Sequence, residues 1–252
     1  MVADSVVIAV DGLTMAFDGR VVQRDVNFSV SRGEIFVIMG GSGSGKSTLL
    51  KAMTGLILPA AGDVFFDGRS FWRADHEQRA AIQRGLGILF QGGALWSSLT
   101  LAENVGLPLS QYTTLTAAEI AEIVSLKLAL VGLKGYEDFF PAEISGGMKK
   151  RAGLARAIAL DPMLLFFDEP SAGLDPISSK RLDDLILELR DALGATIVVV
   201  THELASIFAI ADNSIFLDNA AHTAIAHGNP RQLLRESDNP TVQEFLRRGE
   251  HA

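Results

Sequence analysis

Short apolar runs that alternate with segments of helical spacing set the pattern of this chain. Ile35–Met39 is a continuous apolar run that ends at a glycine, and Thr196–Val200 is a similar run, which is typical of strands buried on both faces. Val26, Phe28 and Val30 alternate with polar neighbours, so a half-buried strand is predicted there. The chain therefore begins with strands and returns to them in its last third.

Helical spacing dominates the middle of the chain. Thr116 and Glu119 form a capping box, which predicts a helix that runs to about Val131. A second helix is predicted to begin at Ser145–Gly147 and to continue up to Asp161, which precedes a proline. These helices separate the strands of the first third from those of the last third.

The last third predicts a strand at Met163–Phe167, a helix over the leucine-rich segment 182–193, and the strand that ends at Val200. Such units with short links imply parallel pairing, so we expect an α/β fold with a mostly parallel sheet. The tail from Gly228 contains two further helical patterns, at 231–236 and 241–248. No internal repeat or interdomain linker is visible, so residues 1–252 are interpreted as a single domain.

Composition excludes several classes of protein and site. With 252 residues, of which 48% are hydrophobic and 21% charged, the chain is globular rather than disordered or fibrous. It has no cysteine, which excludes disulfides, thiol catalysis and thiolate metal sites. Thirty acidic residues against 22 Lys and Arg give a net charge of -8, which argues against a general affinity for nucleic acid or anionic lipid.

The hydrophobic runs are too short for a membrane span, because none approaches the ~18 residues that a spanning helix needs. The first ten residues lack both a basic region and a long apolar core, so we do not expect a signal peptide. The protein is therefore expected in the cytoplasm or at the cytoplasmic face of a membrane.

The segment Gly40–Ser47 fits the phosphate-binding pattern G-x-x-x-x-G-K-[ST]. Its glycines let successive N–H groups point at phosphate oxygens, and the helix that follows presents its positive end to the same anion. Lys46 is expected to reach the β and γ phosphates, and the Ser47 hydroxyl to bind Mg²⁺. A chance glycine-rich loop is disfavoured, because a buried strand precedes it and Leu49 and Leu50 begin a helix face after it.

Other polar residues also follow apolar strands. Asp168 and Glu169 come after an apolar run and are expected to hold Mg²⁺ and to polarise a water molecule, although alone they would indicate only a solvated strand end. His202 follows the strand that ends at Val200, and Gln91 follows the run at 87–90. Ligands collect at the carboxyl ends of parallel strands, which favours a shared site. Asp168 lies so far from Lys46 in sequence that an insertion is expected between them.

Together and in this order, these motifs resemble the ATP-binding subunit of ABC transporters over roughly Val7 to Asp218. The resemblance implies a P-loop NTPase (RecA-like) core formed by 1–91 and 160–227, with an N-terminal antiparallel β region. It also implies an inserted helical subdomain at 92–159 that carries the signature motif, and a C-terminal helical tail at 228–252.

The resemblance further implies a head-to-tail homodimer that encloses ATP and Mg²⁺ between its subunits. Catalysis is assigned to Glu169 as general base, supported by His202, Lys46 and Gln91, and the metal ligands are Ser47, Gln91 and Asp168. The D-loop corresponds to 171–175. The residues expected to contact ATP are Phe17, which would stack on adenine, then Gly40, Gly41, Ser42, Gly43, Ser44, Gly45, Lys46, Ser47 and Thr48, and, for the partner's nucleotide, Ser145, Gly146 and Gly147.

The signature motif departs from the common pattern, with Met148 in place of glutamine and Ile144 in place of leucine. Methionine cannot donate a hydrogen bond, so a polar contact made there in other members is not expected here. The segments 90–109, 144–162 and 239–246 resemble the Mce-associated branch, which includes the ATPases of the Mla pathway of phospholipid transport between inner and outer membranes. That branch implies permease subunits, an MCE-domain lipid-binding protein and a small STAS-domain protein, at the cytoplasmic face of the bacterial inner membrane.

Two further predictions concern whether particular side chains lie on the surface or in the core. Leu95 and Trp96 are expected either in the groove that receives a cytoplasmic helix of the permease or in the core of the helical lobe. Lys149, Lys150 and Arg151 are interpreted as a solvated helix face rather than as a contact for phosphates or acidic partners.

The alternatives in function are transport ATPases for another substrate, such as an amino acid, a metal chelate or a drug. More remote is a soluble ABC protein of translation or DNA repair that acts on nucleic acid. One cassette without a long insert and with a net charge of -8 argues against that last class.

Overall fold

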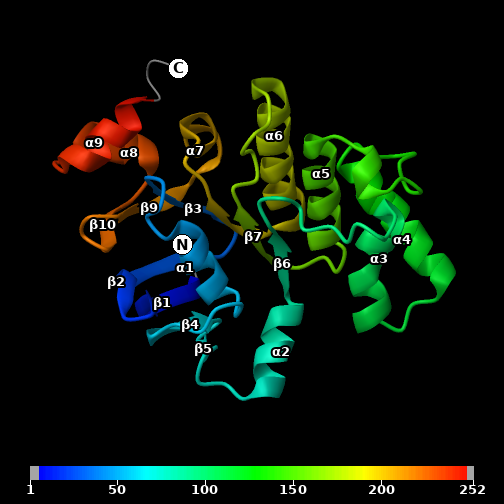
Figure 1. Ribbon diagram of the computed structural model, residues 1–252, viewed down its shortest axis with the longest axis horizontal. Helices are drawn as coiled ribbons and strands as arrows, with labels where there is room; N and C mark the ends of the chain where they lie inside the picture. The colour runs from blue at the N-terminus through cyan, green and yellow to red at the C-terminus, as the bar shows by residue number, and fades with distance from the viewer. Residues whose placement is uncertain (1–5, 249–252) are drawn as a thin grey trace.

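The computed structural model describes residues 6–248; the N-terminal interpretation over 1–5 and the tail prediction over 249–252 lie outside them. A central sheet has the strand order β10-β9-β3-β8-β7-β6 (Figure 1). Its parallel strands are β6 (Leu86–Leu89), β7 (Leu164–Asp168), β8 (Thr196–Val200), β3 (Ile35–Gly40) and β9 (Asn213–Asp218), and β10 (Thr223–His227) pairs antiparallel with β9.

The apolar run of β3 is buried on both faces of this sheet. Ile35, Val37 and Met39 pack into one core cluster, whereas Phe36 and Ile38 pack into the other. This alternation explains why the run carries no polar residue, since neither face of a central parallel strand meets water. The phosphate-loop sequence begins at the end of a strand that is buried at every residue.

A second, antiparallel sheet covers one face of the central sheet. Its strand order is β2-β1-β4-β5, formed by β1 (Val6–Phe17), β2 (Arg20–Ser31), β4 (Ala61–Phe66) and β5 (Arg69–Ser70). Helix α1 (Lys46–Met53) contacts both sheets and shares with them the core that contains Phe36 and Ile38. Packing against this sheet fixes one side of the phosphate loop.

The helical subdomain lies between β6 and β7 in the chain and on the right of Figure 1. It consists of α3 (Leu101–Tyr112), α4 (Ala117–Leu130), the short helix η1 (Pro141–Glu143) and α5 (Gly146–Ala157). Capping boxes begin α3 at Thr100 and α4 at Thr116. Both boxes satisfy backbone donors that would otherwise lack a partner at the helix start.

The remaining helices are α2 (His76–Arg84), α6 (Pro176–Leu193), α7 (Leu204–Ile210), α8 (Pro230–Glu236) and α9 (Pro240–Arg247). In Figure 1 the pair α8 and α9 lies at the end of the molecule opposite the helical subdomain. Val242 and Leu246 bury α9 against the core, and Phe245 makes an edge contact with Phe216 of β9. Between residues 6 and 248 no helix is long and apolar enough to cross a bilayer.

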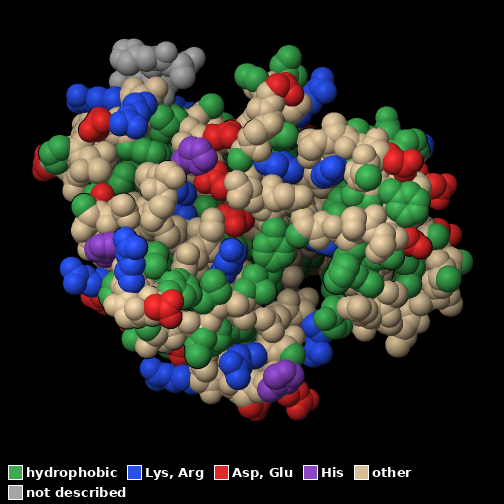
Figure 2. Space-filling model, in the orientation of Figure 1, with side chains coloured by type: hydrophobic (Ala, Val, Ile, Leu, Met, Phe, Trp, Pro, Cys, Tyr) green, Lys and Arg blue, Asp and Glu red, His purple; other side chains and the backbone are tan. Residues whose placement is uncertain are grey.

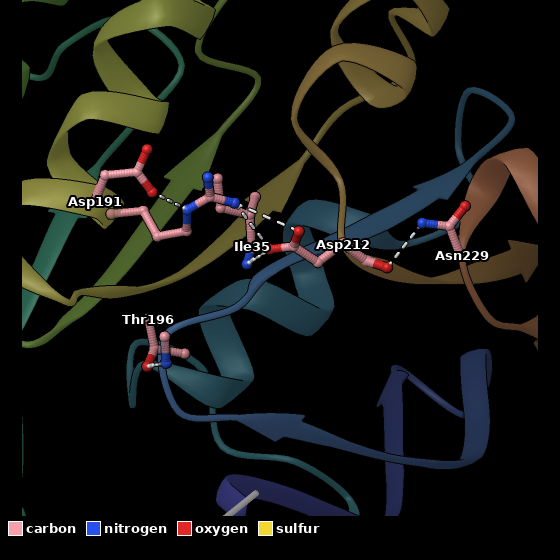
Figure 3. Close-up of polar contacts among 7 residues, drawn as sticks. Ile35, Asp191, Thr196, Asp212 and Asn229 are labelled. Atoms are coloured by element: carbon pink, nitrogen blue, oxygen red, sulfur yellow. Dashed lines mark hydrogen bonds and ion pairs between the residues drawn. The ribbon is translucent and has the colours of Figure 1, made fainter.

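Polar contacts hold the amino end of β3, away from the phosphate loop (Figure 3). Asp212 Oδ2 accepts the backbone N–H of Ile35 at 2.8 Å and lies 3.3 Å from the guanidinium of Arg190 on α6. Asn229 donates to the Asp212 carbonyl at 3.0 Å. These contacts tie β3, α6 and the start of α8 together, so the central strand is anchored where its ladder begins.

The α/β fold with a mostly parallel sheet is confirmed, and so is the strand at Thr196–Val200. The predicted helix from the capping box runs over α4 and ends one residue before Val131. The predicted helix from the signature motif is shorter than expected, because α5 ends at Ala157 and a turn follows in which Asp161 has a φ of 50°. The pattern of hydrophobic and polar residues did not predict α2, β9, β10 or α7.

Candidate nucleotide-binding site

The carboxyl ends of the parallel strands bring part of the phosphate loop, Gln91, Glu169 and His202 to one cavity of about 390 Å³. The phosphate loop follows β3, and Gln91 follows β6. Asp168 is the last residue of β7, Glu169 comes directly after it, and His202 follows β8. The cavity is lined by Val22, Ser42, Gly43, Gly45, Lys46, Ser47, Thr48, Gln91, Glu169 and His202. Residues from four distant segments thus meet at one edge of the sheet.

Glycine is required at two positions of the loop. A Cβ at Gly40 would lie 2.3 Å from the Leu217 carbonyl oxygen of β9, so a side chain cannot fit there. Gly45 has a φ of 85° and caps α1 in the left-handed region, which L residues with a Cβ rarely adopt. The loop can therefore pass close to β9 and turn directly into the helix.

Lys46 is buried at the start of α1 and bonds to its own loop. Its Nζ donates to the carbonyls of Gly40 at 3.0 Å and Gly41 at 2.9 Å. Burial lowers the pKa of Lys46, and the carboxylates of Glu169 and Asp168 oppose that shift. A desolvated ammonium at the phosphate loop is suited to bind a phosphate, whose negative charge would pair with it.

The donor set beside Lys46 fits a hard cation. The Ser47 hydroxyl donates to Asp168 Oδ1 at 2.7 Å, so a hydroxyl and a carboxylate oxygen already face each other. Mg²⁺ prefers such oxygen ligands and usually completes its octahedron with phosphate oxygens and water. Gln91, whose amide oxygen is a ligand of the same kind, lines the same cavity.

Glu169 has an unusual backbone and a half-satisfied carboxylate. Its φ is 49°, in the left-handed region, and its Oε1 lies 2.7 Å from His202 Nδ1. Glu169 Oε2 is buried and has no hydrogen-bond partner within residues 6–248. A buried acceptor without a partner is costly, and such outliers cluster at functional sites. The arrangement suits a carboxylate that accepts a proton from water.

A side chain beneath the loop was not anticipated from the sequence. Gln23 of β2 is fully buried, and its amide donates to the Ser44 carbonyl at 2.7 Å and to the Asp218 carbonyl at 3.0 Å. It therefore joins the phosphate loop to the end of β9. The signal available was its position: Gln23 is polar in a strand whose other inward residues are apolar.

Phe17 and the signature residues lie apart from this cavity. Phe17 ends β1, remains 44% exposed and is not among the cavity-lining residues. Ser145 caps α5, accepting the backbone N–H of Met148 at 3.3 Å, and lines a separate cavity of about 590 Å³ together with Gly147. Within one chain the two helix ends therefore serve different surfaces. The Met148 side chain packs against the core.

The interpretation of Lys149, Lys150 and Arg151 as a solvated helix face is wrong for Lys150 and Arg151. Lys150 is only 7% exposed and donates to backbone carbonyls beyond β7, and Arg151 donates to the carbonyl of Val131 at 3.2 Å. Helical spacing could have indicated this, because Lys150 lies one turn before Leu154 on the buried side of α5.

Asp183 of α6 lies behind the His202 segment and carries a testable pH dependence. It accepts a hydrogen bond from Ser206 of α7 at 2.9 Å. Burial raises its pKa from 3.8 to about 6, assisted by Glu203 and Asp184 and opposed by its bond to Ser206 and by Lys180. The folded protein therefore holds this proton more tightly than the unfolded chain, so the charged form lowers stability above that pH.

We expect Asp183→Asn to raise the free energy of unfolding at pH 7.5 by on the order of 1 kcal/mol. The advantage should shrink as the pH falls through about 6 toward 4, where Asp183 is protonated in the native protein. Urea unfolding at pH 7.5 and pH 4.5 checks this, with Glu188→Gln, at an exposed residue of the same helix, as control. An Asp183→Asn protein that is no more stable at pH 7.5 than the wild type contradicts the prediction.

Comparison with known proteins agrees with this geometry. The sequence model of the family described as ABC transporter matches residues 23–172. The chain belongs to the ABC transporter family. A dimeric ATP-binding cassette in a post-hydrolysis state, bound to ADP and Pi, superimposes on this ABC protein with a TM-score of 0.81 at 28% identity, covering 87% of this chain and 97% of the other. The cbiO1 protein from Clostridium perfringens, part of the ABC transporter complex cbiONQ, gives 0.82 at 28% identity over 98% of both chains.

Relatives of known name also cover most of this ABC protein. The intermembrane phospholipid transport system ATP-binding protein MlaF of Haemophilus influenzae is 42% identical over 95% of this chain and 90% of its own length. MlaF of Escherichia coli is 41% identical over 90% and 83%. The probable ribonucleotide transport ATP-binding protein mkl of Mycobacterium tuberculosis is 42% identical over 95% of this chain, which spans 66% of that relative's length.

Proposed function

We propose that this ABC protein hydrolyses ATP to power phospholipid transport between the inner and outer membranes of a bacterium. The observation that carries the proposal is one cavity that joins the phosphate loop, Glu169 and His202, with Asp168 bonded to Ser47 of its lining. Identities of 41–42% with two MlaF proteins support the phospholipid cargo. The other named relative, mkl, supports transport by a similar cassette with a different printed cargo.

ATP would bind with its phosphates over the loop 40–47 and its β and γ phosphates at Lys46. Ser47 and Asp168 would hold Mg²⁺, with Gln91 as a further ligand. The metal, when bound, neutralises charge that develops on the phosphate oxygens. Phe17, exposed at the end of β1, is free to stack on the adenine.

Glu169 would act as general base on a water placed in line with the γ phosphate. The contact of its Oε1 with His202 orients the carboxylate at the cavity that both residues line, where it would take a proton from that water. When Glu169 is ionised, His202 Nδ1 donates in this pair. His202 also lines the cavity, where its imidazole would stabilise the transferred group.

A second copy of the chain would complete each site. Ser145 and Gly147 lie at the start of α5, where the first backbone N–H groups of a helix have no partner within the helix, and they line a different cavity from Lys46. A head-to-tail homodimer would place this helix end on the partner's γ phosphate. ATP binding would then close the dimer and hydrolysis would release it.

Membrane partners are expected at the helical subdomain, where hydrophobic side chains gather on the surface (Figure 2). Trp96, in the segment before α3, is 60% exposed and therefore does not lie in the core. Leu95 is partly buried and packs against the core. A large exposed aromatic residue is typical of an interface. We propose that Trp96 contacts a cytoplasmic helix of a permease, at the cytoplasmic face of the inner membrane.

We expect Trp96→Ala to lower recovery of the permease by roughly tenfold or more, because a tryptophan that is an interface hot spot contributes about 2 kcal/mol or more. Thermal unfolding of the purified subunit should stay unchanged, because the ring is exposed. The matched control is Leu58→Ala, at a 73% exposed apolar residue outside the helical subdomain. Unchanged recovery, or a destabilised subunit, would count against the interface role.

The cargo is tested by isolating the tagged chain from detergent-solubilised native membranes and identifying co-purifying proteins and lipids by mass spectrometry. A permease together with an MCE-domain protein, a small STAS-domain protein and phospholipid supports the proposal. A permease with another binding protein would keep the ATPase and replace the cargo with an amino acid, a metal chelate or a drug. Ribosomes or DNA without a membrane protein would overturn transport.

A further inference from the structure

Lys150 makes a buried contact between the signature helix and the turn that carries Glu169. The ammonium donates to the carbonyl of Glu169 at 3.2 Å and to the carbonyl of Ala172. Lys150 is 7% exposed and lies in the first half of α5, downstream of Ser145. One side chain therefore touches both ends of the turn that follows β7.

That turn needs support because its first residue is conformationally unfavourable. Glu169 adopts a φ of 49°, a conformation that is unfavourable for a residue with a side chain and persists only where its surroundings impose it. Backbone bonds supply part of the support, from Glu169 N–H to the Val200 carbonyl at 2.8 Å and from Ala172 N–H to the Glu169 carbonyl at 3.3 Å. The charged donor of Lys150 adds to them, and bonds from ionised donors are about twice as strong as neutral ones.

Burying the charged ammonium of Lys150 costs free energy, and hydrogen bonds must offset that cost. Desolvation lowers the pKa of Lys150, while the carboxylates of Glu203 and Glu169 act in the opposite direction. Buried ammonium groups are stable only where they find acceptors. Here the acceptors are the carbonyls of Glu169 and Ala172, at the two ends of the turn.

We propose that Lys150 is a positioning residue that holds Glu169 in its left-handed conformation and couples it to the signature helix. The inference rests on the proposed role of Glu169 as general base. Because Ser145 begins the same helix, a shift of α5 that follows contact with the partner's nucleotide would move the Lys150 ammonium against the turn. Hydrolysis at one site of the dimer would thereby depend on how α5 is seated at the other.

The test uses the transport complex purified from native membranes through a tag on this chain, with ATP turnover and nucleotide affinity measured on each variant. Lys150→Met, which keeps the length of the stem, is expected to lower kcat roughly tenfold to a hundredfold, the usual effect of a small misplacement of a catalytic group. KM for ATP should be unchanged. Lys150→Arg should restore most of the rate, and Lys150→Gln, which keeps a shorter neutral donor, should be intermediate. Lys149→Met on the adjacent residue is the matched control and should behave as wild type.

A cycle with Glu169→Gln separates positioning from general damage. If Lys150 acts through Glu169, Lys150→Met causes no further loss in the Glu169→Gln background. The same fold-loss in both backgrounds, a parallel loss of nucleotide affinity, an unaltered kcat in Lys150→Met, or no rescue by arginine would overturn the inference. Should Glu169→Gln alone keep wild-type turnover, the proposed base itself fails, which is a distinguishable result.

Discussion

Lys46→Ala is expected to lose tight nucleotide binding, with an affinity for ATP at least about 100-fold weaker than that of the wild type. The side chain supplies a buried positive charge at the phosphate loop, and charge-assisted bonds to phosphate are among the strongest polar contacts that a protein makes. In the free protein this ammonium bonds to the carbonyls of Gly40 and Gly41, so its removal also loosens the loop. Titration with a fluorescent ATP analogue measures the loss.

The matched control is Lys51→Ala, on the same helix and away from the cavity lining. It should bind nucleotide as the wild type does. If Lys46→Ala retained wild-type affinity, the phosphates would have to lie elsewhere, and the assignment of the cavity as the nucleotide site would be wrong.

Glu169→Gln is expected to bind ATP normally while its turnover falls by roughly 100-fold or more, in the range that a general base typically contributes. Glutamine keeps the shape of the side chain and a contact for His202 but cannot take a proton. ATP binding would still close the dimer, so the variant should remain dimeric in the presence of ATP. Steady-state phosphate release and size-exclusion chromatography with ATP measure the two effects.

The control for this variant is Glu77→Gln, an exposed residue in the first turn of α2. It should hydrolyse ATP at the wild-type rate and dissociate after turnover. Near-full phosphate release by Glu169→Gln would contradict the assignment of the base, whatever the state of the dimer.

Local pattern predicted much of the fold because the decisive elements are strongly apolar or strongly capped. The run that forms β8 is buried at every residue, and the capping box at Thr116 begins α4 as expected. The elements that the pattern did not reveal are short or weakly amphipathic. Helix α2 has no buried residue, and α7 spans only 7 residues, so neither leaves a clear hydrophobic period.

Part of the candidate site could be predicted from the sequence for a different reason. Its residues follow strands that are parallel neighbours in the sheet, so topology alone brings Gln91, Asp168, Glu169 and His202 to one edge. Gln23 was out of reach, because its bond to Ser44 depends on how two sheets pack.

Lys150 shows a further limit of sequence pattern. A run of basic residues is usually solvated, and composition cannot tell that one ammonium turns inward toward Ala172. The spacing of Lys150 from Leu154 was the only local indication that it lies on the buried side of α5. Only the packing of α5 against the turn after β7 shows which carbonyls its ammonium reaches.

The central claim is that ATP hydrolysis at this cavity moves phospholipid. The most direct measurement reconstitutes the purified complex into vesicles with labelled phospholipid and follows its redistribution after ATP is added. The account predicts movement that requires ATP, is absent with Glu169→Gln and is unaffected by Glu77→Gln. Hydrolysis without any movement of phospholipid, or ATP-driven transport of a soluble substrate in the same vesicles, would contradict it.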